Sequence, residues 1–270
     1  MARQGNRFFV GAYNRGSLLE WDPFAPWVDT NPETPTCNPL HLLDCTPTIM
    51  RPHKLLAHPD GKTIVMGGTP IYGCTGGGLL FWDRQTRNRV LVTHEEILPD
   101  HSTLSLAALP GAKLLGGTTT APGTGGQRKA KQAELYLLDV ATKRIQWHQA
   151  VFPGTQSYTD LLLSPEGLVY GFADQHRFFV LDPATRKVVH ERFTETELGR
   201  TISAPRVFVP GPQQQVYVLF NKGIARVEPQ NFQIKLIAES PMRIGIGGDC
   251  LDGRIYFAEG SHVYSFQLPQ

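Results

Sequence analysis

The chain has 270 residues, of which 41% are hydrophobic and 19% charged, a composition that is sufficient for a packed core. Its formal net charge of +2 is too small for the whole chain to act as a polyanion-binding protein. No apolar run approaches the ~20 residues of a membrane helix, and the N-terminus lacks the regions of a secretory signal. We therefore expect no nucleic-acid partner, no membrane partner and a cytoplasmic location as written. Secretion would follow if a leader had been removed.

The four cysteines are Cys37, Cys45, Cys74 and Cys250, and none belongs to a CxxC pair. This spacing argues against a zinc site or a redox motif. A single disulfide between Cys37 and Cys45 is conceivable, but free thiols are the preferred interpretation.

In chain order, the first predicted element is a pair of strands in residues 7–23, with no strand ahead of it. Residues 24–50 follow, rich in Pro, Thr and Asn, with few strand signals beyond PLHLLD. We expect a partial repeat and then an irregular linker.

From residue 51 onward a hairpin pattern repeats, consisting of an apolar run, a tight turn rich in Pro, Gly and Asp, and a second apolar run. The copies are HKLLAHPDGKTIVMGG from His53, LSLAALPGAKLLGG from Leu104, TDLLLSPEGLVYGFA from Thr159, PRVFVPGPQQQVYVLF from Pro205 and GIGGDCLDGRIYFAEG from Gly245.

After each of the first four hairpins a third strand ends on an acidic residue, and a turn and a fourth β-rich run follow. These acids are Asp83, Asp139, Asp182 and Glu228, which recur at intervals of 56, 43 and 46 residues. An acid at the first position of a type I turn accepts hydrogen bonds from backbone N–H groups just ahead, so we predict turn capping rather than catalysis.

Four strands at this interval predict an all-β chain, a single β-propeller domain over residues 1–270 with about five to six blades. The predicted blades are residues 7–23 (partial), 51–93, 103–150, 157–193, 201–238 and 244–268. The last repeat ends on its third strand, HVYSFQL. Either the N-terminal segment completes the last blade, or the chain belongs to a larger propeller.

The pattern is similar to bacterial WD40-like and quinoprotein-like propellers, on the strength of HPDG, SPEG and LDPATRK. The GH…WD spacing of true WD40 repeats and the tryptophan-docking motif of quinoproteins are not present. The resemblance covers most of the chain and implies a fold but no particular activity.

In propellers the strand two-to-three loops and the segments leading into each first strand share one face, where ligands usually bind. Two such loops, residues 69–78 and 118–132, are rich in Gly and Thr. The glycines are explained either by the backbone shape of the loops or by close approach of the backbone to a ligand. The collected segments are basic, and a cationic face on a near-neutral protein would attract an anionic ligand. The alternative is that these loops are simply polar and their charges are solvated. The candidate binding residues are Arg15, His101, Arg128, Lys129, Lys131, Tyr158, Arg206 and Arg243.

The candidate catalytic residues are Arg51, His53 and Tyr72, from the start of one inner strand and the long loop of the same repeat. β-Elimination of a uronate needs a cation at the carboxylate, a base for the α-proton and an acid at the leaving oxygen. Arg51, His53 and Tyr72 fit these roles in that order. The alternative for His53 is a hydrogen-bonded residue at a strand start.

The Gly-rich loops lack the spacing and trailing Lys of a phosphate loop, and no metal or hydrolase motif is present. We expect no cofactor, although a cation in the central channel stays open, and we interpret His58, His94, His148 and His190 as structural. Two functions remain. One is a carbohydrate-active propeller that binds an anionic, uronate-containing polymer, with or without cleaving it by β-elimination, or binds a small anionic ligand. The other is a non-catalytic scaffold for a protein partner.

Overall fold

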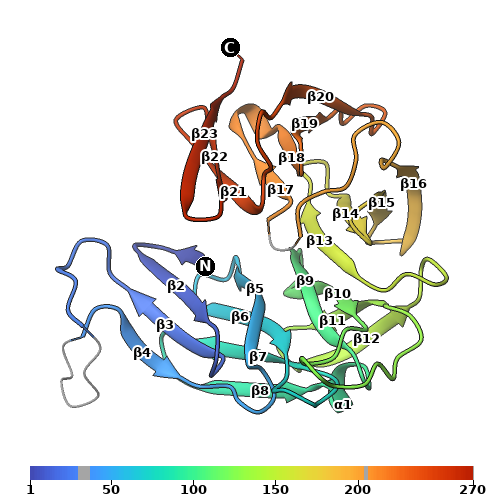
Figure 1. The fold of residues 1–270 in the computed structure, drawn as a ribbon. Helices are drawn as coiled ribbons and strands as arrows, with labels where there is room; N and C mark the ends of the chain where they lie inside the picture. Colours follow the sequence, from blue (N-terminus) through green and yellow to red (C-terminus); the bar gives the residue numbers. More distant parts are fainter. Residues whose placement is uncertain (30–36, 204–205, 270) are drawn as a thin grey trace. The chain divides into compact units, whose positions relative to one another are not determined.

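A computed structural model describes residues 1–29, 37–203 and 206–269. The chain divides into two compact units, Met1–Ser157 (unit 1) and Tyr158–Gln270 (unit 2). Each unit carries three antiparallel sheets in the described ranges, and these sheets are blades of a β-propeller (Figure 1). The predicted all-β propeller is therefore confirmed. That the whole chain is a single domain stays a prediction.

Unit 1 contains three four-stranded blades whose strands follow one another in chain order. The first is formed by β1 (Ala2–Gln4), β2 (Arg7–Ala12), β3 (Ser17–Trp21) and β4 (Leu40–Leu43). The second has β5 (Arg51–Ala57), β6 (Thr63–Thr69), β7 (Gly78–Asp83) and β8 (Arg89–Thr93), followed by the short helix α1 (His94–Ile97). The third has β9 (Ser102–Leu109), β10 (Lys113–Thr119), β11 (Leu135–Asp139) and β12 (Arg144–Gln149).

Unit 2 contains two four-stranded blades and one of three strands. The first has β13 (Tyr158–Leu163), β14 (Val169–Ala173), β15 (Arg177–Asp182) and β16 (Lys187–Phe193). The second has β17 (Phe208–Pro210), the turn η1 (Pro212–Gln214), β18 (Val216–Phe220), β19 (Gly223–Val227) and β20 (Ile234–Glu239). The third has β21 (Ile246–Leu251), β22 (Arg254–Glu259) and β23 (His262–Gln267).

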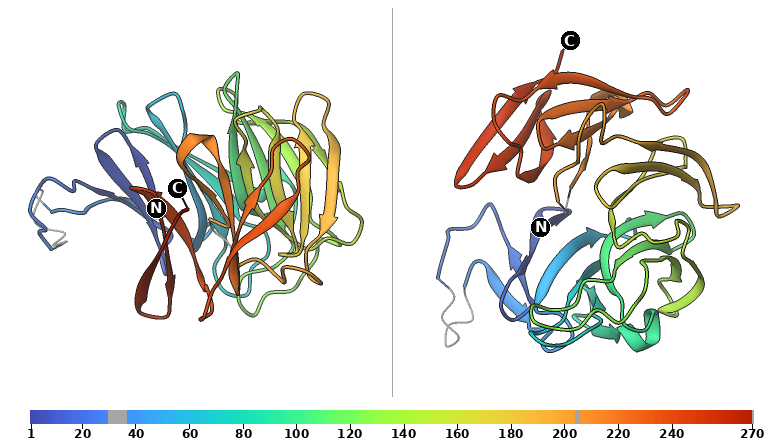
Figure 2. Two further views of the ribbon diagram at one scale, coloured as in Figure 1. Left: turned by 90° about the horizontal axis from the view of Figure 1, so that it is seen from above. Right: turned by 45° about the vertical axis from the view of Figure 1, so that its right-hand side comes forward.

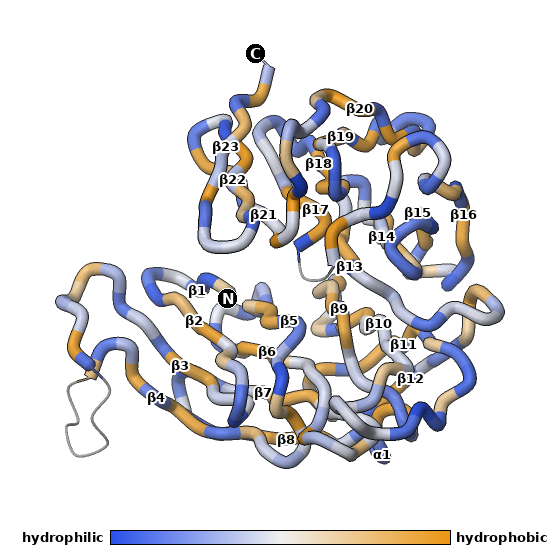
Figure 3. Tube along the Cα trace, viewed as in Figure 1, coloured by the Kyte–Doolittle hydropathy of each residue, from blue (hydrophilic) through white to orange (hydrophobic). Residues whose placement is uncertain are grey.

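The burial of each strand follows its place in the blade. The second strands β6, β14 and β18 are buried along their whole length, whereas the outer strand β16 alternates between exposed and half-buried residues. A strand covered on both faces reads as a continuous apolar run, and one covered on a single face alternates. Figure 3 accordingly shows hydrophobic residues concentrated along strands and hydrophilic ones at many turns.

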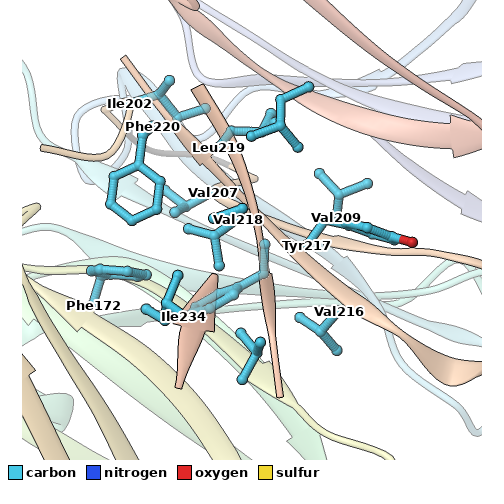
Figure 4. Packing of buried hydrophobic residues seen from close by; sticks show 14 of the residues in the cluster. Phe172, Ile202, Val207, Val209, Val216, Tyr217, Val218, Leu219, Phe220 and Ile234 are labelled. Atoms are coloured by element: carbon cyan, nitrogen blue, oxygen red, sulfur yellow. The ribbon is translucent and has the colours of Figure 1, made fainter. Parts of the chain in front are cut away.

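Side chains from neighbouring blades fill the space between the sheets of each unit. In unit 2, the ring centroid of Phe172 of β14 lies 5.4 Å from that of Phe208 and 6.0 Å from that of Phe220, both in the next blade. Figure 4 shows Phe172 and Phe220 in this cluster. In unit 1, β5 lies beside β2 of the preceding blade and β9 of the next (Figure 2). This packing holds the ends of the inner strands, and the loops beside them, in fixed positions.

The predicted turn capping is confirmed for the three aspartates. Asp83 Oδ1 accepts hydrogen bonds from the N–H groups of Gln85 and Thr86, both at 2.9 Å. The carboxylates of Asp139 and Asp182 each accept hydrogen bonds from the N–H and the hydroxyl of the threonine three residues further along the chain. The side chain of Glu228 is longer than that of aspartate, and its carboxylate forms an ion pair with Arg226 at 2.7 Å instead.

The first blade differs from the prediction because it has all four strands. β1 supplies the inner strand ahead of residue 7, and β4 supplies the outer strand inside the predicted linker. The three residues of β1 are too few to show a periodic pattern, and β4 stands in a Pro-rich context. Residues 30–36 of the predicted linker lie outside the described residues. The last blade has three strands, as expected, and the four cysteines are free thiols.

Candidate functional site

The strand two-to-three loops of unit 1 lie at one end of its blades and are joined by hydrogen bonds. The N–H of Gly73 in the β6–β7 loop donates to Thr124 O at 3.0 Å, and the N–H of Gly123 in the β10–β11 loop donates to Cys74 O at 3.0 Å. Thr75 Oγ1 donates to Gln127 O at 2.6 Å. The two Gly-rich loops therefore form one bonded layer.

The glycines in these loops are explained by contact of one loop with the other. A Cβ on Gly123 would lie 2.2 Å from Ile71 O, and one on Gly126 would lie 2.6 Å from Cys74 O. Both distances are too short for any side chain. The close contact between the two loops therefore requires glycine at these positions, and the glycines alone do not indicate a ligand.

A cluster of four residues, called here the Arg51 cluster, lies on this layer: the exposed Tyr13, Tyr72 and Thr124 and the half-buried Arg51. The guanidinium carbon of Arg51 lies 5.2 Å from the ring centroid of Tyr13, and Nη2 donates to Thr124 Oγ1 at 3.4 Å. The hydroxyls of Tyr13 and Tyr72 are hydrogen-bonded to each other. Three blades thus contribute to the cluster, with a cation and two phenols on an accessible surface.

The environment moves the pKa values of the two phenols in opposite directions. The hydrogen bond from Tyr72, and then the adjacent Arg51, lower the pKa of Tyr13 below its usual 10.0. The same hydrogen bond raises the pKa of Tyr72. These directions correspond to a Tyr72 hydroxyl that donates and a Tyr13 oxygen that accepts. Their side chains are 54% and 52% exposed respectively, so a ligand can reach both.

His53 lies two residues from Arg51, at a bulge in the β5–β6 ladder, and is partly buried. Burial, with a smaller effect of the Arg51 charge, lowers the pKa of its imidazole to about 4. The ring is therefore neutral at pH 7, but an imidazole whose conjugate acid has so low a pKa is a weak base.

The other predicted residues of unit 1 surround this layer. Arg15 pairs with Asp44 at 2.9 Å, and Lys129 lies 3.9 Å from Asp100. His101 is held by the backbone, with its ring nitrogens 2.8 Å from Pro99 O and 2.9 Å from Gln132 O. The exposed residues Arg128 and Lys131 follow Thr124 along the same loop.

Three predicted residues belong to unit 2. Tyr158 is fully buried, with its ring edge-on to Phe179 at 5.8 Å, so its side chain is not accessible from the surface. Arg206 pairs with Asp249 at 3.1 Å, and Arg243 is exposed. Of the predicted residues in unit 1, the structure brings together Arg51 and Tyr72.

Sequence reasoning missed Tyr13 and Thr124. Both stand in loops that the blade pattern assigned to the ligand face, residues 12–17 and 118–132. An aromatic or hydroxyl residue in such a loop is a weak signal, because only the fold decides which loop tips meet.

Within the described ranges, no group of three or more His, Cys, Asp and Glu side chains is placed to hold a metal ion. None of the described helices has the length and apolar character needed to cross a membrane.

Comparison with known proteins supports the fold. No family model and no curated protein matches the sequence. Among solved structures, the extracellular domain of BT4673 from B. thetaiotaomicron, named as a one-component system in one structure and a hybrid two-component system in another, superposes with a TM-score of 0.67 and 13% identity. The match covers 98% of this chain and 34% of that one.

The WD40 repeats of RRP9 superpose with a TM-score of 0.60 and 11% identity, over 85% of this chain and 63% of that one. This chain thus spans about a third of the first structure and less than two thirds of the second. At such identities the likeness concerns architecture alone. The chain has the β-propeller fold.

Proposed function

We propose that the loop end of unit 1 binds an anionic, uronate-containing polysaccharide and cleaves it by β-elimination. The observation that carries this proposal is the Arg51 cluster, in which a guanidinium and two hydrogen-bonded phenols meet at an accessible surface. A guanidinium matches the planar geometry of a carboxylate and can bind both of its oxygens.

The cluster supplies the three groups that the reaction requires. Arg51 neutralises the uronate carboxylate, which acidifies the α-proton. The Tyr13 phenolate removes that proton, the C–H electron pair becomes the new carbon–carbon double bond, and the bond from the β-carbon to the glycosidic oxygen breaks. Tyr72 donates a proton to the leaving oxygen. The opposite pKa shifts of the two phenols suit a base and an acid, respectively.

Tyr13 takes the base role that the sequence suggested for His53. The imidazole is partly buried and its pKa is lowered to about 4, whereas Tyr13 is exposed and its phenolate is stabilised by the Tyr72 hydroxyl and then by Arg51. The exposed side chains of Arg128 and Lys131 add positive charge in the same loop layer as Thr124, where further carboxylates of a polymer would bind.

The test incubates the protein with a panel of uronate polysaccharides and follows the absorbance of the unsaturated product. We expect activity from the natural chain, and a loss of about 100-fold or more from Tyr13→Phe, the scale of a proton-transfer group. Arg51→Gln should weaken binding as well. Arg144→Gln, an exposed arginine of β12 away from the cluster, is the control. Absence of both product and binding across the panel would reject the proposal.

A specific observation favours the second function, a scaffold for a protein partner. Phe24 and Trp27, in the connection between β3 and β4, are 82% and 66% exposed. Large exposed apolar side chains are typical of interaction surfaces. A partner retained in stoichiometric amounts by the natural chain and lost with Phe24→Ser/Trp27→Ser would support this function. Equal retention by the variant would argue against it.

A further inference from the structure

A polar cavity of about 260 Å³ lies in unit 2, among the turns of its first two blades. Its lining comes from the β13–β14 turn, the β17–β18 turn and the segment from β19 into the following turn. The residues that the argument uses are Glu166, Tyr170, Gln213, Gln214, Arg226 and Gln230. This region contains none of the residues of the Arg51 cluster, and its chemistry is different.

The charges of the cavity are already compensated or negative. Arg226 binds Glu228 through Nε at 3.1 Å and Nη2 at 2.7 Å, which lowers the pKa of that carboxyl. Glu166 accepts a hydrogen bond from the Tyr170 hydroxyl at 3.3 Å. Burial, and then the charge of Glu166, raise the pKa of Tyr170 to about 12, so its hydroxyl stays protonated. An anion would meet Glu166 without a free cation to bind it.

Three carboxamides complete the lining, those of Gln213, Gln214 and Gln230. The three residues are exposed, and within the described part of the chain their side chains have no hydrogen-bond partner in the protein. Each carboxamide offers two donors and an acceptor. The cavity therefore presents unengaged neutral donors and acceptors together.

The backbone beneath two of these side chains has a conformation that glutamine disfavours. Gln213 and Gln214 have φ values of 55° and 61°, and Gln215 N–H donates to Pro212 O at 3.1 Å. This is a two-residue type I′ turn, in which Asn-Gly or Gly-Gly is preferred because both central residues are left-handed. Residues held in disfavoured backbone conformations are concentrated at functional sites, where their side chains bind or react.

We propose that this cavity is a second ligand site and that it binds an uncharged saccharide unit. Sugar hydroxyls are both donors and acceptors, so they complement the carboxamides and the carboxylate of Glu166. An anionic ligand would lose hydration without an opposite charge, and an apolar one would leave the carboxamides unpaired. The volume is slightly below the range of about 300–1,000 Å³ that is usual for ligand pockets, which suits one sugar ring rather than a larger ligand.

The experiment measures binding of glucose, galactose, mannose, xylose, cellobiose and maltose by saturation-transfer NMR and calorimetry. We expect at least one of these neutral sugars to bind the natural chain. The double variant Gln213→Gly/Gln214→Gly should weaken that binding about tenfold or more, through loss of two hydrogen-bonding groups. Its melting temperature should stay the same or rise, because Gly-Gly suits the turn.

Two further variants make the result decisive. Gln230→Ala removes the third carboxamide without touching the turn and should also weaken binding, which decides the outcome if the double variant folds poorly. Gln85→Ala, an exposed glutamine of the β7–β8 turn, should bind as the natural chain does. If no sugar of the panel binds, or if the Gln213/Gln214 and Gln230 variants bind unchanged, the proposal is wrong. Arg51→Gln should leave neutral-sugar binding intact, which separates this site from the proposed uronate site.

Discussion

At the scale of single residues, the structure shows how neighbours decide what a titratable side chain can do. Tyr13 and Tyr72 are chemically identical, yet the hydrogen bond between them lowers the pKa of Tyr13 and raises that of Tyr72. His53, which the sequence singled out as a base, is made a weak one by burial. The chemical role of a residue therefore follows from its partners rather than from its type.

His53 leads to a prediction about stability and pH. Because its folded-state pKa of about 4 lies below the usual 6.5, the unfolded chain binds the proton more readily between these values. The free energy of unfolding should then fall as the pH drops from 6.5 toward 4, with a contribution of at most about 1.4 kcal/mol per pH unit from this group. His53→Gln should flatten the curve in urea titrations over this range. The exposed His262→Gln should not, and an unchanged slope in His53→Gln would contradict the expectation.

At the scale of elements, the two Gly-rich loops act as one structure rather than as two flexible segments. Backbone hydrogen bonds join residues 73–74 to residues 123–124, and this layer carries Tyr72 and Thr124. The site thus depends on a backbone approach between two loops from neighbouring blades.

Substitution of a glycine at this contact should test that dependence. Gly123→Ala puts a Cβ about 2.2 Å from Ile71 O, so one loop must move. We expect a loss of about 1–3 kcal/mol in the free energy of unfolding, measured in urea, together with weaker uronate binding. Gly125→Asn is the matched control, because its surroundings are open and asparagine tolerates its φ of +79°. Equal stability of the two variants would refute this account of the loops.

At the scale of the whole molecule, the same aspartate-capped turn recurs in three blades. Asp83, Asp139 and Asp182 each cap the turn after a third strand, and backbone N–H groups with the following threonine hold their pKa values below 3.8. A depressed carboxyl pKa contributes stability that is complete above the unfolded pKa and is lost as the pH falls through the folded one.

The triple variant Asp83→Asn/Asp139→Asn/Asp182→Asn should therefore be less stable at neutral pH and should lose less stability below about pH 4. Denaturation midpoints measured across the acid range check both effects. Asp252→Asn, an exposed aspartate with a φ of 50°, is the control because asparagine tolerates that backbone. A triple variant with the same acid profile as the natural chain would show that the caps do not set acid stability.

The sequence by itself determined the blades, because strand periodicity and turn chemistry act over a few residues and repeat. It also located the loop end where Arg51 and Tyr72 meet. It could not indicate the short strand β1, which is recognisable only through its pairing with β2. Only the tertiary structure decided that Tyr13 is the partner of Tyr72, that Tyr158 is buried and that the loop glycines serve contact between loops. Each of these depends on which distant segments come together, and side-chain types and local spacing do not encode that proximity.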